Sequence, residues 1–132
     1  APERLKEGAA GYDDKGMPIP RTLEEIKAAG TLFANPRAEW VEMNNESRTQ
    51  AGLWVHKTVE ALVWYDIMSR LPRIKAVSTL VLYGEHDRLR DGEDLLLNNI
   101  PNASKVVLPG LGHIPQIEDP EAFVSAVLNF LS

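Results

Sequence analysis

Two short segments of this sequence hold the side chains best suited to chemistry. Residues 84–87 (Gly-Glu-His-Asp) and residues 110–113 (Gly-Leu-Gly-His) each directly follow a short apolar run. If those runs are neighbouring parallel strands, both segments lie at the edge of the sheet where α/β proteins place their sites. We therefore expect Asp87 and His113 to form a hydrogen bond. A carboxylate in that position orients the imidazole and stabilises the imidazolium that forms when the ring takes up a proton.

The elements that must position these residues come from the second half of the chain. The apolar run 76–83 ends in Gly84, and its length and composition predict a strand buried on both faces. Asp91 can cap a helix that follows, residues 105–108 predict a second strand, and Asp119-Pro120 begins a final helix. The order of strand, helix, strand and helix predicts parallel strands in a layered α/β architecture. Two strands are too few for a parallel sheet, so the sheet is expected to be incomplete.

The first half predicts helices instead. Thr22 and Glu25 form the capping-box pattern that begins a helix, and Gly30 is a suitable left-handed end for it. Asn35-Pro36 predicts the start of a second helix, with Asn35 as the cap and Pro36 in the first position. Apolar residues at helical spacing predict a third helical stretch over 51–70, ended by Pro72.

Composition excludes several classes of function. Lys and Arg number 14 against 19 Asp and Glu, for a net charge of −5, and the basic residues form no cluster, which argues against binding to nucleic acid or anionic membranes. No apolar run approaches the roughly 20 residues of a membrane span, and the start of the chain is unlike a signal peptide. The absence of Cys excludes disulfides, zinc–thiolate sites and a thiol nucleophile. We expect a cytoplasmic protein without a cofactor.

Several segments resemble the α/β-hydrolase-fold enzymes, over roughly residues 74–132. The first segment resembles the strand and loop that carry the acid of that family, and the others resemble its histidine loop and last helix. One departure is Ser78, where the family commonly has Pro. The resembling segments are residues 80–87, 100–103, 109–115, 118–123 and 130–131.

The resemblance implies a fold class and roles for two residues. The fold is α/β, with residues 73–132 forming the last two parallel strands and their helices from the C-terminal part of an α/β-hydrolase core. Asp87 would be the acid and His113 the base of a catalytic triad that cleaves an ester or similar carbonyl substrate. The spacing fits an acid–base pair, so we expect no metal site at His86, Asp87 and His113.

The family's nucleophile lies in a Gly-X-Ser-X-Gly turn between a strand and a helix. No two glycines of this sequence stand four positions apart, so the turn is absent, and the oxyanion-hole loop is missing as well. The resemblance therefore implies a partner, a separate N-terminal hydrolase-core chain that carries both features. Without it we expect the chain to be inactive and poorly soluble. Whether such two-chain units assemble into homo-oligomers is left open.

The same resemblance assigns residues 21–72 to a helical cap, or lid, preceded by an irregular lead-in over 1–20. A lid must present large apolar groups to a small apolar carbonyl substrate, and we expect Phe33, Trp54 and Ile114 to line that pocket. Otherwise the three Trp residues are expected to form the core of the lid. We expect His86 to point away from Asp87, His56 to be an ordinary helix residue, and Glu118 to hold the backbone of the histidine loop.

Alternative functions remain open. The lid is loosely similar to that of carbon–carbon hydrolases that process aromatic ring-cleavage products, whereas Ile114-Pro115 is commoner in esterases and lactonases. A dehalogenase or epoxide hydrolase with an Asp nucleophile is another alternative within the fold, since the residue type of the missing nucleophile is unknown. Outside enzymes, the chain could belong to a non-catalytic ligand-binding member of the fold or to a helical interaction module.

Overall fold

The computed structural model describes residues 11–132, which divide into two compact units. One unit contains residues 11–25 and 37–66, and the other contains residues 26–36 and 67–132. These units do not follow the predicted boundaries, because residues 26–36 group with the C-terminal segment. Within the described part of the chain, no helix has the length and apolar character needed to cross a membrane.

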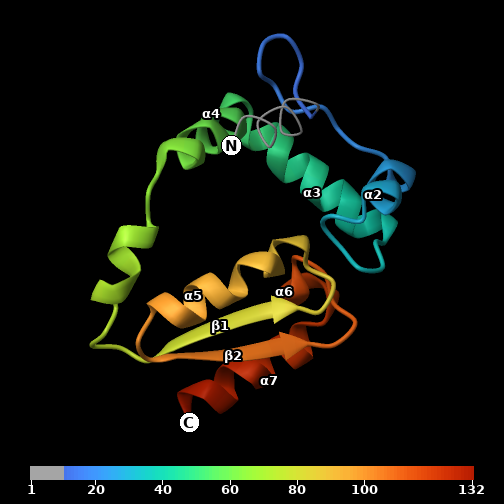
Figure 1. Ribbon diagram of the computed structural model, residues 1–132. Helices are drawn as coiled ribbons and strands as arrows, with labels where there is room; N and C mark the ends of the chain where they lie inside the picture. The colour runs from blue at the N-terminus through green and yellow to red at the C-terminus, as the bar shows by residue number, and fades with distance from the viewer. Residues whose placement is uncertain (1–10) are drawn as a thin grey trace. The chain divides into compact units, whose positions relative to one another are not determined.

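The second unit contains a parallel pair of strands with helices on both faces. Strands β1 (Thr79–Gly84) and β2 (Ala103–Leu108) are in register from Thr79 opposite Ala103 to Gly84 opposite Leu108. Helix α5 (Glu93–Asn99) lies on one side of the pair and helix α7 (Pro120–Leu131) on the other (Figure 1). The predicted order of strand, helix, strand and helix is confirmed. The buried apolar residues of this unit are Ile26, Phe33, Leu71, Val81, Ile100 and Leu108.

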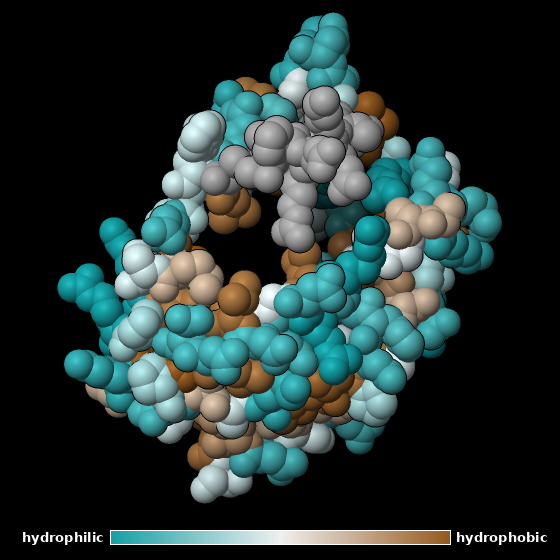
Figure 2. All heavy atoms as spheres, viewed as in Figure 1, coloured by the Kyte–Doolittle hydropathy of each residue, from teal (hydrophilic) through white to brown (hydrophobic). Residues whose placement is uncertain are grey.

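Strand β1 differs from the prediction in length and burial. It begins at Thr79 rather than Ala76, and only Val81 and Gly84 of its residues are buried, so the prediction of a strand buried on both faces is wrong for the described chain. The physical reason is the small sheet, in which β1 has one neighbouring strand. Apolar residues are accordingly exposed on this unit, as the brown areas of Figure 2 show. They include Leu95, Val124, Leu128 and Leu131.

One edge of β1 is open. Thr79 donates its backbone N–H to Asn102, and Glu85 donates to Leu108. In a parallel ladder the residues that bond one neighbour alternate with residues whose N–H and C=O groups face the opposite edge. The backbone groups of Leu80 and Leu82 therefore face that edge, where no strand within residues 11–132 pairs with β1.

The predicted cap of the last helix is confirmed, whereas the one before α5 is not. Asp119 accepts a hydrogen bond from the N–H of Ala122 at 2.9 Å, and Pro120 is the first residue of α7. Asp91 was expected to cap the helix after β1, but it lies within a 3₁₀ helix, η2 (Arg88–Gly92), and Gly92 precedes α5. The capping carboxylate is that of Asp87, at the start of η2.

Helix α2 (Leu23–Ala29) begins and ends as the sequence predicts. Thr22 donates its N–H to Glu25 at 2.7 Å, and Glu25 donates its N–H to the Thr22 hydroxyl at 3.2 Å, which completes the capping box. The hydrogen bonds that the Thr22 N–H and then the Thr22 hydroxyl donate to the Glu25 carboxylate lower its pKa. Gly30 follows with φ of +55°, the left-handed conformation that suits glycine at a helix end.

The predicted helix start at Asn35-Pro36 is wrong. Helix α3 (Ala38–Ala51) begins later, with Arg37 as its N-cap. The reason is that the backbone of the preceding segment is engaged elsewhere, since Leu32 and Ala34 hydrogen-bond to residues near the end of the chain.

The third helical stretch is divided, and its large aromatic residues are exposed. Helix α4 (Leu53–Trp64) ends well before Pro72, which lies inside a 3₁₀ helix, η1 (Met68–Arg73). Trp54 and Trp64 are 76% and 86% exposed, so the expectation that they form a core is wrong for the described residues. Helix α4 begins directly after the turn at Gly52. In the described part of its unit, Val41 is the buried residue of the hydrophobic core, so the rings of Trp54 and Trp64 do not pack into a core.

Candidate active site

The candidate site is a hydrogen bond between two loops of the second unit. His113 Nδ1 lies 3.0 Å from Asp87 Oδ2. The loop after β1 carries the carboxylate and the loop after β2 carries the ring, as parallel strands require. The Asp87 side chain is 5% exposed, whereas the His113 side chain is 40% exposed. The arrangement therefore leaves part of the imidazole accessible while the carboxylate is enclosed.

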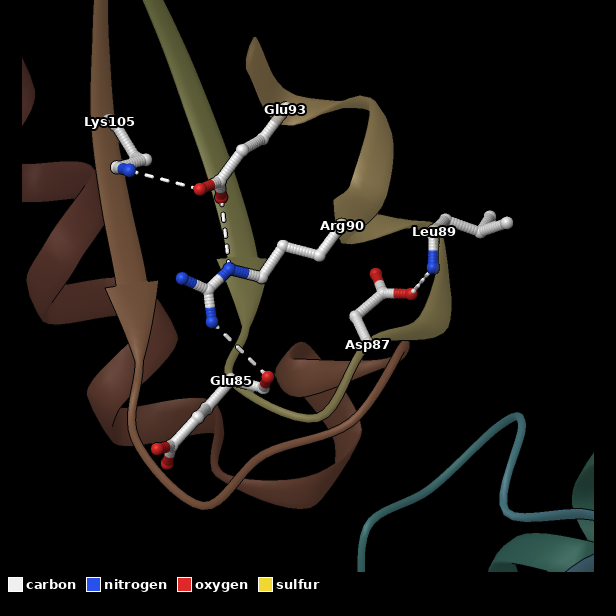
Figure 3. Close-up of polar contacts among 6 residues, drawn as sticks. All are labelled: Glu85, Asp87, Leu89, Arg90, Glu93 and Lys105. Atoms are coloured by element: carbon white, nitrogen blue, oxygen red, sulfur yellow. Dashed lines mark hydrogen bonds and ion pairs between the residues drawn. The ribbon is translucent and has the colours of Figure 1, made fainter.

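Its own loop holds the Asp87 carboxylate. Oδ1 accepts a hydrogen bond from the N–H of Leu89 at 2.8 Å, and the Asp87 N–H donates to the carbonyl of Gly84 at 3.1 Å. Figure 3 shows the carboxylate facing the Leu89 N–H at the start of η2. Because Oδ1 is occupied in this way, Oδ2 is the oxygen that remains for His113.

A charged cluster, formed by Arg90, Glu93 and Lys105, fastens this loop to β2. One carboxylate oxygen of Glu93 lies 3.0 Å from Arg90 Nε, and the other lies 3.0 Å from Lys105 Nζ. Arg90 Nη1 also donates to the backbone carbonyl of Glu85 at 3.3 Å, so the guanidinium spans the loop (Figure 3). The hydrogen bond from Arg90, and then that from Lys105, lowers the pKa of Glu93.

Tyr83, near the end of β1, interacts electrostatically with the carboxylates of the site. Burial raises the pKa of Tyr83, and the carboxylates of Asp87 and Glu93 raise it further. Its phenol therefore keeps its proton throughout the physiological pH range.

More distant segments hold the histidine loop. The backbone N–H of His113 donates to the carbonyl of Leu32 at 3.0 Å. Glu118 accepts from the N–H of Gly112 at 2.7 Å through Oε1 and from the N–H of Ala34 at 2.9 Å through Oε2. Glu118 thus holds the backbone of this loop, as the sequence suggested.

The two loops are also joined directly to one another. Gly110 donates its N–H to Glu85 Oε2 at 2.8 Å, and His86 donates its N–H to the carbonyl of Leu111 at 2.9 Å. Their backbones approach so closely that a Cβ atom at Gly84 would overlap the carbonyl oxygens of Leu111 and Gly112. Glycine is therefore required at the end of β1 for the two loops to meet.

The predicted pocket residues lie in different parts of the molecule. Phe33 is 3% exposed and Ile114 is half-buried, and both belong to the same unit as the Asp87–His113 pair. Trp54 belongs to the other unit and is exposed. A groove of about 480 Å³ lies between the strands and α7, with Leu80 and Phe130 among its lining residues, and it includes none of these three.

Within residues 11–132, the hydrogen bonds and ion pairs of the other two histidines go to residues outside the pair. His86 Nε2 is 3.9 Å from Glu85, and its side chain is 59% exposed. His56 is a helix residue of α4 that contacts Glu60 at 3.0 Å and the ring of Tyr12 edge-on. In the described part of the chain, no three His, Asp or Glu side chains are placed to share a metal ion.

Sequence reasoning missed two parts of this site. The contact between Glu93 and Arg90 has the three-residue spacing of a helical ion pair, which could have been noticed. Nothing in the sequence marks the contact of Glu118 with Ala34, because these residues are 84 positions apart and the second takes part through its backbone alone.

The chain is similar in sequence to two proteins named as hydrolases. The chain is 32% identical over 116 residues to a putative carbamate hydrolase, RutD, of Stutzerimonas stutzeri, covering 79% of this chain and 43% of the relative. It is 31% identical over 121 residues to a 2-hydroxy-6-oxononadienedioate/2-hydroxy-6-oxononatrienedioate hydrolase of Pseudomonas putida, covering 83% and 42%. The chain therefore spans less than half the length of these relatives. No protein-family model matches it.

A solved structure agrees with the sequence relatives. A thermophilic esterase aligns with a TM-score of 0.63 and 26% identity, over 88% of this chain and 51% of that one. The likeness again covers about half of the longer protein.

Proposed function

Since this chain belongs to the α/β-hydrolase superfamily and represents the C-terminal portion of that fold, we propose that it supplies the acid and the base of a catalytic triad. The single observation that supports this assignment is the 3.0 Å contact between His113 Nδ1 and the enclosed carboxylate of Asp87. A carboxylate can only accept, so Nδ1 carries the hydrogen and Nε2 is the nitrogen that can receive a proton.

In the proposed reaction, an oxygen nucleophile attacks the carbonyl carbon of the substrate while Nε2 of His113 takes its proton. The tetrahedral intermediate collapses, and the leaving group departs with that proton. Water then attacks the acyl intermediate and gives a proton to Nε2. The second tetrahedral intermediate collapses as its bond to the nucleophile oxygen breaks, that oxygen regains the proton from Nε2, and the acid product is released. Asp87 stabilises the imidazolium in both stages and keeps the ring oriented.

The nucleophile and the oxyanion hole would come from a partner, which we propose to be a separate N-terminal hydrolase-core chain. Two observations support this. None of the serines lies between two glycines in the Gly-X-Ser-X-Gly pattern, and the open edge of β1 offers the backbone groups of Leu80 and Leu82 to another strand. Mass spectrometry of the native protein tests the proposal. A copurifying chain with the Gly-X-Ser-X-Gly turn supports it, and one longer polypeptide that contains both portions overturns it.

An ester or similar small apolar carbonyl compound is the proposed substrate. The likeness to an esterase supports the ester. The two relatives act, by their names, on a carbamate and on a dienedioate or trienedioate, and these favour carbon–carbon or carbamate hydrolysis as the second candidate. All three reactions use the same acid and base, so the lid and the missing half of the pocket must distinguish them.

Activity measurements test the proposal directly. The isolated chain should not hydrolyse a p-nitrophenyl ester, and the complete protein should. A panel of p-nitrophenyl esters, a carbamate and a ring-cleavage product would rank the substrates by kcat/KM. Equal turnover by the isolated chain would show that the nucleophile lies within it.

A non-catalytic, ligand-binding protein of the same fold is an alternative from outside the enzymes. His113→Ala separates it from an enzyme. An enzyme would lose turnover and keep substrate affinity, whereas a binding protein would show no turnover in either form.

A further inference from the structure

We propose that Glu118 is a positioning residue for His113, and that it acts by tying the histidine loop to a strap formed by residues 32–34. This inference rests on the proposed function, because it concerns the base of the proposed triad. It goes further in assigning a role to a carboxylate that touches neither the imidazole nor Asp87.

Three hydrogen bonds connect the strap with the loop. Leu32 accepts from the His113 N–H at 3.0 Å, and the carboxylate of Glu118 joins the N–H of Ala34 to the N–H of Gly112 at 2.9 and 2.7 Å. The backbone N–H groups of Gly112 and His113 are therefore both hydrogen-bonded, the first to Glu118 and the second to Leu32. The strap itself precedes α3 and reaches the site from the other end of the chain.

Gly112 packs closely against both the strap and the carboxylate of Glu118. A Cβ atom at Gly112 would lie 2.6 Å from the Ala34 nitrogen and 2.8 Å from Glu118 Oε1. The strap, the glycine and the carboxylate thus meet at one point, and the backbone direction at residue 113 is set there.

His113 needs such a support more than Asp87 does. The Asp87 carboxylate is held by the Leu89 N–H in its own loop and is 5% exposed. The His113 ring is 40% exposed, and Asp87 is the one ring contact that the structure records for it within residues 11–132. Its orientation therefore depends on the backbone from which it projects.

Only a carboxylate serves both donors in this way. Each oxygen of Glu118 accepts one backbone N–H, and a charged acceptor forms the stronger hydrogen bond. An amide offers one oxygen and would turn its NH₂ group toward the second donor. Alanine would leave the N–H groups of Gly112 and Ala34 without these acceptors.

The test follows the Nδ1-bound proton of His113 by NMR, in ¹⁵N-labelled protein kept together with any chain that copurifies. Glu118→Ala should accelerate the exchange of this proton with water by about tenfold or more, because the ring is no longer held against Asp87. Glu118→Gln should give an intermediate rate. Glu121→Gln, the same chemical change at an exposed position of α7, is the matched control and should leave the rate unchanged.

Glu118→Gln decides the matter if the alanine variant does not fold, and circular dichroism identifies that case. Exchange in Glu118→Gln that equals the wild-type rate overturns the proposal, as does equal acceleration in Glu121→Gln. The proton signal does not depend on turnover. Loss of the proposed function, shown by an active His113→Ala enzyme, is therefore distinguishable from loss of the positioning role.

Discussion

The loop that carries the acid and the loop that carries the base are built by opposite means. Asp87 is held within residues 84–93, by contacts that span two to five positions along the chain. His113 is held by a strap from the first third of the sequence, through a contact that spans 84 positions. The hydrogen bond between Asp87 and His113 thus joins a residue held by local contacts to a residue held by distant ones.

The acid loop and the base loop should therefore be sensitive to substitutions at different positions. Local contacts form wherever the segment folds, so the acid should tolerate changes elsewhere in the chain. The base should respond to changes at distant positions that touch no reacting group. Four tests, ordered from the largest expected effect to the smallest, examine this difference.

Removing either member of the pair should have the largest effect. In the complete enzyme, His113→Ala and Asp87→Asn should each lower kcat by roughly 10³-fold or more. His113→Ala removes the base itself. Asp87→Asn replaces the carboxylate with a neutral amide, which neither stabilises the imidazolium nor keeps the hydrogen on Nδ1. The double variant should be little worse than His113→Ala alone, since the residues act as one unit. Steady-state kinetics on a p-nitrophenyl ester provide the measurement, and additive losses would show that the pair does not act together.

Gly112→Ala, in the base loop, should lower the free energy of unfolding more than a matched substitution in the acid loop. Its Cβ atom would meet the backbone of Phe33 at 2.9 Å and that of Ala34 at 2.6 Å, so the strap must move. We expect a loss of about 1–3 kcal/mol in the free energy of unfolding, measured by urea denaturation.

The control for this variant lies in the acid loop. A Cβ atom at Gly92 would have no neighbour within 4 Å, and its φ of −90° suits any residue. Gly92→Ala should therefore change the stability much less than Gly112→Ala. Similar losses for the two would contradict the difference between the loops.

Asp119→Ala tests a local contact that directly follows the base loop. It removes the hydrogen bond to the Ala122 N–H at the start of α7, which should cost about 1 kcal/mol. Because this cap does not touch the strap, the NMR signal of the His113 ring should stay unchanged. A shifted ring signal would mean that α7 also positions the base.

Glu93→Gln should have the smallest effect and should show in the pH dependence. The folded-state pKa of Glu93 lies below its ordinary value, so its ion pairs stabilise the fold above that ordinary value, and this contribution is lost as the pH falls. The wild type should therefore lose stability more steeply than Glu93→Gln between about pH 6 and pH 3. Thermal melts across this range, with Glu121→Gln as the control, provide the measurement. Parallel curves for wild type and Glu93→Gln would contradict it.

The division between local and distant contacts also explains what the sequence could predict. The capping box at Thr22 and the cap at Asp119 are patterns within four residues, and both are present in the structure. The meeting of Asp87 with His113 was predictable too, because it follows from two strands being parallel and adjacent.

What could not be predicted depended on distant partners. Asn35-Pro36 has a good local signal for a helix start, but Ala34 is already bonded to Glu118, and α3 begins after Arg37. Trp54 has the character of a core residue, yet it is exposed, and the described part of its unit forms only a small core around the buried Val41. In each case the local preference is correct as a preference, and the tertiary structure decides against it.

The separation between Ala34 and Glu118 also has a consequence for synthesis. At about 5–20 residues per second, the ribosome adds the 84 intervening positions in roughly 4–17 seconds, and the strap must wait that long for its carboxylate. The contacts that hold the Asp87 carboxylate and the Arg90 guanidinium, by contrast, lie within residues 85–93. The contacts that hold the acid can therefore form before Glu118, the residue that ties the base loop to the strap, has been made.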